Sequence, residues 1–434
     1  MKKAAYIIVL TVLFSLFSYL LKKMLENAGL PNFPSYLRDI LIFSLFAWLA
    51  YRTPILFNRR IFLSISLLSL LFSIYLLSAT LASQFMVGLY YVRIYLVPFL
   101  FFMLCIAVFS SISSADLQRV MRWVVYLNVF ILVTASILYA VILQSPVAHG
   151  FFLGYGQLAS AWHLAGANTL RMGLPLTSPN NLGVYIALTN CLLLSLILLP
   201  KNNLLLSAQT AQPLLSKNIP PVFLWLLVAL NLIILLLTFS RSALLLFLLT
   251  ALFFMFIPRV LSWRVLRVAG LALLMGILVL PLVLWVANIL SDYALEKWFY
   301  LNSNGTDPSL GGHSDSIAAA IQDFPMYALK GYPHGTVGPK ADLFSLITHN
   351  VENSLLSLWF DLGIFGVLAY VLAYGLLVNV GYQHRFQLPI LLGFLLIMQA
   401  LPYVFEPELM MYFMFIYVLI GHVATRAQPR SSKE

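Results

Sequence analysis

The chain has 434 residues, of which 62% are hydrophobic and only 9% are charged. Soluble domains usually carry about 25% charged residues, so this composition excludes a soluble enzyme and is typical of a membrane protein. The net charge of +11 does not indicate nucleic-acid binding, because the basic residues are spread over short segments between apolar runs, as the positive-inside rule predicts.

A membrane-spanning helix needs roughly 20 apolar residues, and the sequence predicts about 12 of them. The expected spans are residues 5–21, 37–51, 61–80, 88–109, 123–143, 181–199, 221–238, 242–257, 268–289, 353–378, 388–402 and 409–424. We therefore expect an all-α polytopic membrane protein in which residues 1–434 form a single transmembrane domain. The first run lacks a small-residue cleavage site, which predicts a retained first helix rather than a signal peptide.

The run of residues 221–257 has to turn back on itself. As one helix it would be about 55 Å long, nearly two membrane thicknesses. Its polar interruption is Thr238-Phe-Ser-Arg-Ser242, which predicts a tight turn that places Arg241 at the membrane surface.

The distribution of charge predicts the orientation. With the N-terminus in the cytoplasm, most lysines and arginines lie on the cytoplasmic side and most acidic residues lie on the other side, which predicts that both termini are cytoplasmic. Two long segments then face outward, residues 144–180 and 290–352. In the second, Ile317, Ala320, Ile321 and Phe324 recur at helical spacing, which predicts a helical loop region lying on the membrane surface.

Three arginines are candidates for binding an anion. Arg171 precedes Ser178-Pro179, which is typical of a helix start whose free N–H groups favour an anion. Arg241 offers a fork of donors that suits phosphate oxygens. Arg93 lies inside a span, where a charge normally faces a cavity or a partner. The alternatives are an interfacial arginine beside a capped helix for Arg171 and contact with lipid headgroups for Arg241.

His349-Asn-Val-Glu-Asn353 opens the tenth predicted span. His349, Glu352 and Asn353 share one helix face, and an imidazole beside a carboxylate is a candidate general base. The alternatives are an inert surface histidine and a Glu352 that only pairs with the helix dipole. No Asp-x-Asp pair occurs in the outward segments, which argues against a metal-dependent transferase, and we expect neither a metal nor a cofactor.

These stretches resemble the bacterial O-antigen polymerase and O-antigen ligase superfamily, the Wzy and WaaL type glycosyltransferases. The resemblance covers residues 165–380 and rests on the segment that begins at Arg171, on Leu237-Thr-Phe-Ser-Arg241-Ser-Ala, and on His349-Asn-Val-Glu-Asn followed by Asp361-Leu-Gly-Ile-Phe-Gly. Their order and the long outward segment before the third also match. The first 150 residues match only as a hydropathy profile.

The resemblance implies a GT-C-like, metal-independent and inverting glycosyltransferase of the bacterial inner membrane, with its active site facing the periplasm. Its donor and acceptor would be glycans linked to undecaprenyl pyrophosphate, within membrane lipids and with a chain-length regulator as a further partner. Arg171, Arg241 and Arg93 would bind the pyrophosphate, and His349, or Glu352 instead, would be catalytic.

Two activities within the superfamily remain open at this point, with a third outside it. Gly312-His-Ser-Asp, Gly331-Tyr-Pro-His-Gly and Gly88-Leu-Tyr-Tyr-Val-Arg93 look more like O-antigen polymerases, which we favour. His349-Asn350 is common among ligases, which join the finished glycan to lipid A core in lipopolysaccharide biosynthesis. A lipid or sugar transporter is the alternative that is not an enzyme, and the absence of apparent repeats argues against it.

Overall fold

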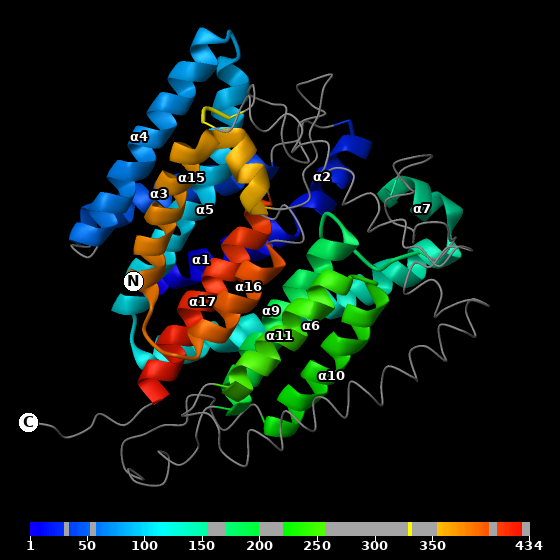
Figure 1. Cartoon of the computed structure of the whole chain (residues 1–434). Helices are drawn as coiled ribbons and strands as arrows, with labels where there is room; N and C mark the ends of the chain where they lie inside the picture. The colour runs from blue at the N-terminus through cyan, green and yellow to red at the C-terminus, as the bar shows by residue number, and fades with distance from the viewer. Residues whose placement is uncertain are drawn as a thin grey trace, which may run out of the picture.

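The structure of the protein, a computed structural model, describes residues 1–29, 34–52, 58–153, 170–198, 220–256, 329–331, 354–398 and 406–427. Its regular elements are helices (Figure 1): α1 Lys2–Leu16, α2 Ser18–Asn27, α3 Pro34–Arg52, α4 Arg59–Leu81, α5 Phe85–Ser111, α6 Ser114–Gln144, α7 Pro146–Leu153, α9 Pro179–Leu198, α10 Pro221–Leu237, α11 Arg241–Phe256, α15 Ser354–Gly381, α16 Gln387–Ile397 and α17 Pro407–Ala427.

The chain is a multi-pass helical membrane protein. Within the described ranges, 6 helices are long and apolar enough to cross a membrane, or up to 7 if the bent pair α1–α2 counts as one span. These are α4, α5, α6, α9, α15 and α17, and each coincides with an expected span. Helices α3, α10, α11 and α16 also occupy expected positions. The expected span 268–289 and the loop 290–352, apart from residues 329–331, lie outside the described residues, so the expected total of about 12 spans stays a prediction.

The first expected span is bent rather than straight. Residues 5–21 were expected to form one helix, but α1 ends at Leu16 and the chain bends by 55° between α1 and α2. The hydroxyls of Thr11, Ser15 and Ser18 each donate to a backbone carbonyl three or four residues earlier. Such bonds compete with the helical ladder and often bend helices, and their succession up to the break accounts for the bend.

Helices α5, α9 and α17 form the interior of the bundle. In each of them 89% of the most apolar window is buried, compared with 33% to 39% in α4, α6 and α15. Helix α17 packs against α5 on one side and α9 on the other, α4 and α15 pack together on α5, and α10 and α11 cover α9. The outer helices turn large apolar side chains outward, for example Leu70 and Leu77 of α4 and Phe365 of α15, as lipid contact requires.

Helix ends that the alternating direction of the expected spans places on the same side of the membrane also meet in the structure. At one end the starts of α3 and α5 are joined by Asp39 and Arg93, and the starts of α3 and α17 by Arg38 and Glu408. At the opposite end, Arg426 of α17 donates to the carbonyl of Phe109 in α5 at 3.0 Å. We call the end that carries Arg38 and Arg93 the site end.

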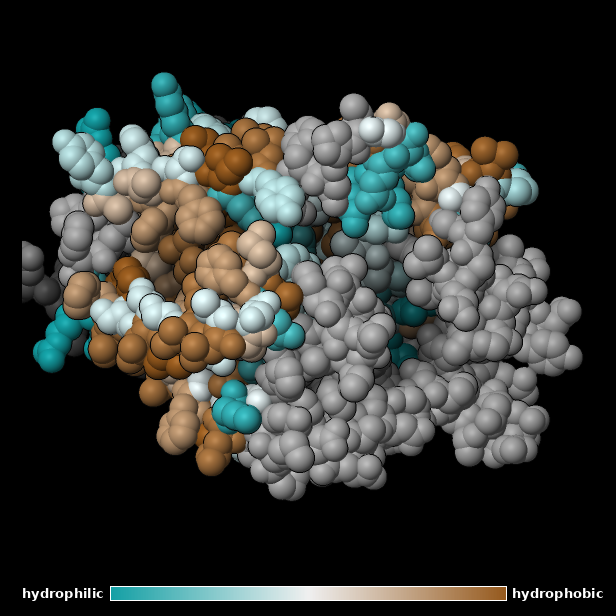
Figure 2. Space-filling view, turned by 90° about the horizontal axis from the view of Figure 1, so that it is seen from above, coloured by the Kyte–Doolittle hydropathy of each residue, from teal (hydrophilic) through white to brown (hydrophobic). Residues whose placement is uncertain are grey.

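The surface of the described residues is divided by polarity. In the view from above in Figure 2, apolar side chains cover one flank, and hydrophilic side chains show in the recessed middle of this face. Apolar flanks suit lipid, whereas polar groups set back between them need water, a ligand or each other. This face is therefore the candidate location of a functional site.

Helix α15 contains a break where glycine is required. Gly363 has φ 68° and ψ 174°, a conformation that is essentially restricted to glycine. A Cβ there would overlap the carbonyl oxygen of Leu329, and a Cβ on Gly331, which has φ +81°, would lie 2.6 Å from the carbonyl oxygen of Asp361. The short turn at residues 329–331 thus packs directly on the break in α15.

Candidate functional site

The start of α9 is the first part of the site. As the Ser178-Pro179 pattern predicts, α9 begins at Pro179, and Ser178 caps it by accepting a hydrogen bond from the backbone N–H of Asn181 at 3.2 Å. The Asn181 side chain donates to the hydroxyl of Thr177. A helix start concentrates unpaired N–H groups and the positive end of the helix dipole at one place.

Arg171 connects this start to the end of α10. Its Nε donates to the carbonyl of Thr238 at 2.9 Å, and its Nη2 donates to the side chain of Asn180 at 2.7 Å and to the carbonyl of Phe239 at 3.4 Å. The backbone N–H of Met172 donates to the carbonyl of Leu237 at 3.0 Å. Arg171 therefore holds the chain before α9 against the α10–α11 turn, whatever else it binds.

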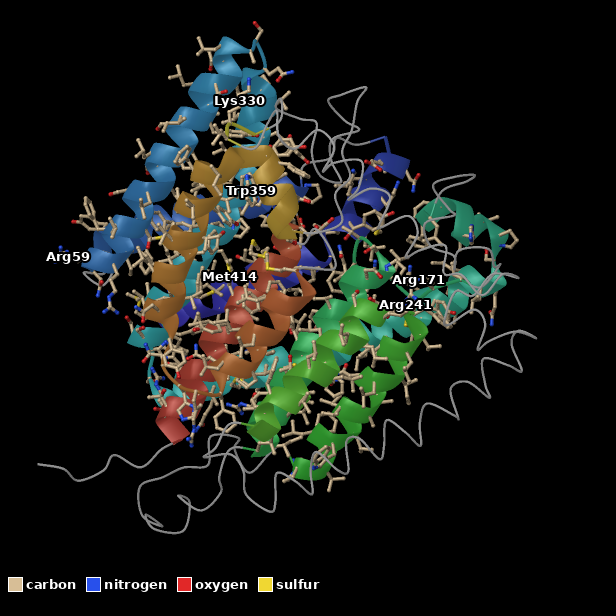
Figure 3. All side chains as sticks on the ribbon, viewed as in Figure 1. Arg59, Arg171, Arg241, Lys330, Trp359 and Met414 are labelled. Carbon is tan, nitrogen blue, oxygen red and sulfur yellow. The ribbon has the colours of Figure 1, made fainter. Side chains whose placement is uncertain are left out.

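The α10–α11 turn forms where the polar interruption predicts it. Helix α10 ends at Leu237, Phe239 adopts a positive φ of 49°, and α11 begins at Arg241. A Cβ on Gly183 of α9 would lie 2.8 Å from Ala243 Cβ and 3.0 Å from Ser240 Cβ. This close approach sets the starts of α9 and α11 side by side, and Figure 3 shows Arg171 and Arg241 near each other at this end of the helices.

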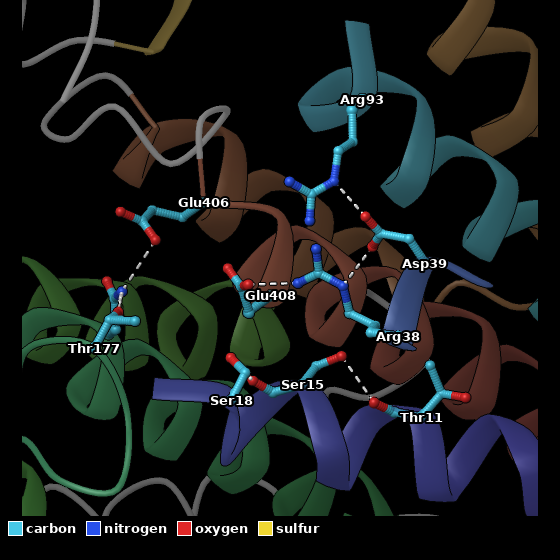
Figure 4. Close-up of polar contacts among 10 residues, drawn as sticks. Thr11, Ser15, Ser18, Arg38, Asp39, Arg93, Thr177, Glu406 and Glu408 are labelled. Atoms are coloured by element: carbon cyan, nitrogen blue, oxygen red, sulfur yellow. Dashed lines mark hydrogen bonds and ion pairs between the residues drawn. The ribbon is translucent and has the colours of Figure 1, made fainter. Parts of the chain in front are cut away.

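Arg93 lies in a second cluster at the same end. Its Nε donates to the carboxylate of Asp39, whose other oxygen accepts from Arg38 Nε at 2.8 Å. Arg38 also donates to Glu408 (Figure 4), and its side chain is only 3% exposed. The Arg93 guanidinium lies 4.7 Å from the ring centroid of Tyr36 and is 23% exposed.

This cluster alternates positive and negative groups and ties α3, α5 and α17 together. Buried charges persist only when they are paired and hydrogen-bonded. Arg38 and Asp39, which are adjacent in the sequence, also pair with each other. The carboxylate partners of Arg93 and Arg38 across the bundle were not predicted from the sequence.

Glu406 contacts the first cluster and lies close in the sequence to the second. Its Oε2 accepts a hydrogen bond of 3.4 Å from the side chain of Asn181 (Figure 4), and it stands two residues before Glu408. A series of polar side chains, joined partly by hydrogen bonds and partly by adjacency in the sequence, thus crosses the site end. We call it the polar band, and its members are Arg171, Asn180, Asn181, Glu406, Glu408, Arg38, Asp39 and Arg93.

The sequence offered one weak signal for the acidic part of this band. Glu406-Pro-Glu408 stands directly before an apolar run, and acidic residues in a first helical turn usually serve the helix dipole. Nothing in that local pattern shows that Glu408 meets an arginine 370 residues away in the chain.

Asp361 is the centre of a further group of buried polar side chains. Its carboxylate, in a residue that is 2% exposed, accepts hydrogen bonds from the hydroxyls of Tyr75 at 3.0 Å and of Tyr95. Tyr374 donates to the backbone carbonyl of Tyr95 at 3.2 Å. In the sequence Asp361 is only part of a motif, whereas in the structure its hydrogen bonds join α15 to α4 and α5.

The predicted catalytic residues His349 and Glu352 lie outside the described residues. Their role therefore stays a prediction. Across the ranges that the structure describes, no three His, Cys, Asp or Glu side chains are grouped as a metal site would require. The two cysteines, Cys105 and Cys191, are both buried.

Comparisons with protein-family models, with curated proteins and with solved structures give no match for this chain. The sequence motifs and the geometry of the site end are therefore what indicate a function.

Proposed function

We propose that the protein is an inner-membrane glycosyltransferase of the O-antigen polymerase type. It transfers a growing glycan from undecaprenyl pyrophosphate onto a sugar hydroxyl of the next lipid-linked repeat unit. The observation that carries the proposal is the convergence of two helix starts, those of α9 and α11, with Arg171 and Arg241 at one end of a membrane bundle.

This arrangement supports binding of a diphosphate. Each helix start contributes about half a positive charge from the helix dipole, and each arginine adds a guanidinium whose donors suit phosphate oxygens. Arg171 is already oriented by the carbonyl of Thr238 and by Asn180, so little reorganisation is needed when negative charge develops on the leaving group. Preorganised donors of this kind stabilise a transition state most effectively where water is scarce.

The transfer breaks the bond between the anomeric carbon of the donor sugar and the diphosphate oxygen, and the electron pair leaves with the diphosphate. The hydroxyl oxygen of the acceptor sugar forms the new glycosidic bond from the opposite face, which inverts the configuration. Its proton passes to a base, for which the sequence motif favours His349, with Glu352 as the alternative. Neither a metal nor a cofactor takes part in the proposed reaction.

The proposal is tested by glycan ladders from cells in which the chromosomal copy is replaced by variants. Arg171→Ala, Arg241→Ala and His349→Ala should each abolish long chains while the protein remains in the membrane at normal abundance. Removing one preorganised donor typically lowers turnover by about 10²–10³-fold. Arg59→Ala, at an exposed position away from the site end, is the matched control and should leave the ladder unchanged. Normal ladders from all three site variants would refute the mechanism.

The same system separates the rival activities. A ligase requires purified lipid A core as acceptor, whereas the proposed polymerase lengthens the glycan on lipid-linked repeat units alone. A transporter moves its substrate without forming a covalent product. Glycan transfer that depends on lipid A core would therefore identify a ligase, and movement of substrate without chain growth would identify a transporter.

A further inference from the structure

An apolar cavity lies beside the Arg93 end of the polar band. It has a volume of about 480 Å³, within the range of pockets that hold small molecules. Its walls come from α3, through Phe43 and Phe46, and from α4, through Ser69 and Ser73, and its floor from α5, through Val92 and Leu96. Both α3 and α4 pack against α5, so the cavity is a groove between two helices over a third.

The groove and the charged cluster are joined along the helices. Asp39 precedes Phe43 by four residues on α3, and Arg93 precedes Leu96 by three residues on α5, so each charged residue lies about one helical turn, or 5.4 Å, from a lining residue. Asp39 and Arg93 also bind each other, so this ion pair stands next to the groove, within about one helical turn of its lining residues.

Arg93 has more hydrogen-bond donors than its contacts use, so it can also bind an anion. Among the described residues its one hydrogen bond runs from Nε to Asp39, and its ring partner Tyr36 belongs, like Asp39, to α3. The two Nη nitrogens retain four N–H donors in a fixed planar fork, which matches phosphate oxygens. An apolar groove with a guanidinium at one end complements a molecule with a hydrocarbon chain and an anionic head.

We infer that this groove holds the hydrocarbon tail of the acceptor, an isoprenoid diphosphate whose diphosphate lies against Arg93. The inference rests on the proposed function, because chain growth requires two lipid-linked diphosphates at once, a donor and an acceptor. Arg171 and Arg241 hold the first. Arg93 holds the second at the other end of the same polar band, so both reacting sugars extend over one face.

The experiment uses the full-length protein in detergent micelles and a photoreactive farnesyl diphosphate as probe, with labelled peptides mapped by mass spectrometry. Ser73→Trp fills the groove from an exposed position, and Ser69→Trp does so independently. Ile74→Trp is the matched control, because the Ile74 side chain is 59% exposed and does not line the groove. Arg93→Gln removes the charge that faces the head. Each variant is first shown to elute as the parent protein does.

We expect labelling of α4 and α5 that falls about tenfold or more in the two groove-filling variants and in Arg93→Gln, and that persists in Ile74→Trp. Equal labelling by photoreactive farnesol, unaffected by Arg93→Gln, would overturn the inference by showing an ordinary lipid-facing crevice. Complete displacement of the probe by phosphatidylglycerol would overturn the inference in favour of a bilayer phospholipid. Labelling that is unchanged in both groove-filling variants would show that the probe does not bind in the groove.

The outcome is separable from that of the proposed reaction. Labelling at the groove together with normal ladders from the Arg171 and Arg241 variants would support the lipid site and contradict the proposed polymerase. Loss of ladders in those variants without labelling at the groove would support the proposed polymerase and contradict the inferred lipid site.

Discussion

Gly363 carries the strictest backbone requirement in the described chain. Its φ of 68° and ψ of 174° belong to glycine, and the carbonyl oxygen of Leu329 occupies the space where a Cβ would lie. Gly375, in the same helix, has nothing within 4 Å of its Cβ position. The two positions therefore separate backbone strain from the general effect of losing a glycine.

Gly363→Ala should lower the thermal midpoint in detergent micelles, because the forced conformation alone costs about 1–3 kcal/mol before the overlap with Leu329 is relieved. Gly375→Ala should raise the midpoint slightly, since alanine favours a helix over glycine by about 1 kcal/mol. Equal midpoints for the two variants would show that α15 is not broken at Gly363.

Asp361 shows how a buried carboxylate is kept in an apolar bundle. Asp361→Leu removes the acceptor for the hydroxyls of Tyr75 and Tyr95, and each buried donor left unsatisfied costs about 1–3 kcal/mol. The loss of stability should shrink in a background that carries Tyr75→Phe and Tyr95→Phe, because no hydroxyl then lacks an acceptor. Thermal unfolding of the four proteins measures this coupling, and an equal loss in both backgrounds would contradict the hydrogen bonds.

The helices are tied at the site end by side chains from distant parts of the sequence. Arg38 of α3 bonds Asp39 beside it and Glu408 at the start of α17. Removing one partner of such a buried network leaves charges without compensation, which is more destabilising than any single surface contact.

Arg38→Met should therefore lower the free energy of unfolding by about 3–5 kcal/mol. Arg119 makes an exposed pair with Asp116 within α6, with 44% of the Arg119 side chain accessible. Arg119→Met should cost at most about 0.5 kcal/mol. A thermal midpoint that falls equally in both variants would mean that the α3–α17 contact does not hold the bundle together.

Local signals predicted much of the element structure. The α9 start and the α10–α11 turn were predicted because Ser178-Pro179 and the polar stretch Thr238–Ser242 act within a few residues of themselves. The bend between α1 and α2 was missed because a hydropathy profile carries no information on side-chain hydroxyls that donate hydrogen bonds to the backbone. The polar band was missed because its contacts join residues 225 and 370 positions apart, and hydropathy carries no information on such pairs.

The threading expected from the sequence would place the two ends of the bundle on opposite sides of the membrane. Ala82, in the exposed turn between α4 and α5, lies toward the site end, and Ser114, at the exposed start of α6, lies at the other. Both native cysteines are buried and therefore give a low background with thiol reagents.

A membrane-impermeant maleimide applied to spheroplasts should label Ala82→Cys and spare Ser114→Cys until the membrane is permeabilised. This result is expected because positively charged segments are retained on the cytoplasmic side, which leaves the site end facing the periplasm. The reverse pattern would place the arginines in the cytosol, where no periplasmic glycan could reach them.

The most direct test of the proposed function is chain growth by the purified protein in liposomes that contain only the lipid-linked repeat unit of its own strain. The parent protein should release undecaprenyl pyrophosphate and form glycans of many repeats without lipid A core. Arg171→Ala and Arg241→Ala should lower the rate by about 10²–10³-fold, with Arg59→Ala unaffected. Absence of chain growth by the folded parent protein, or equal growth by both site variants, would contradict the proposal that these two arginines hold the departing diphosphate.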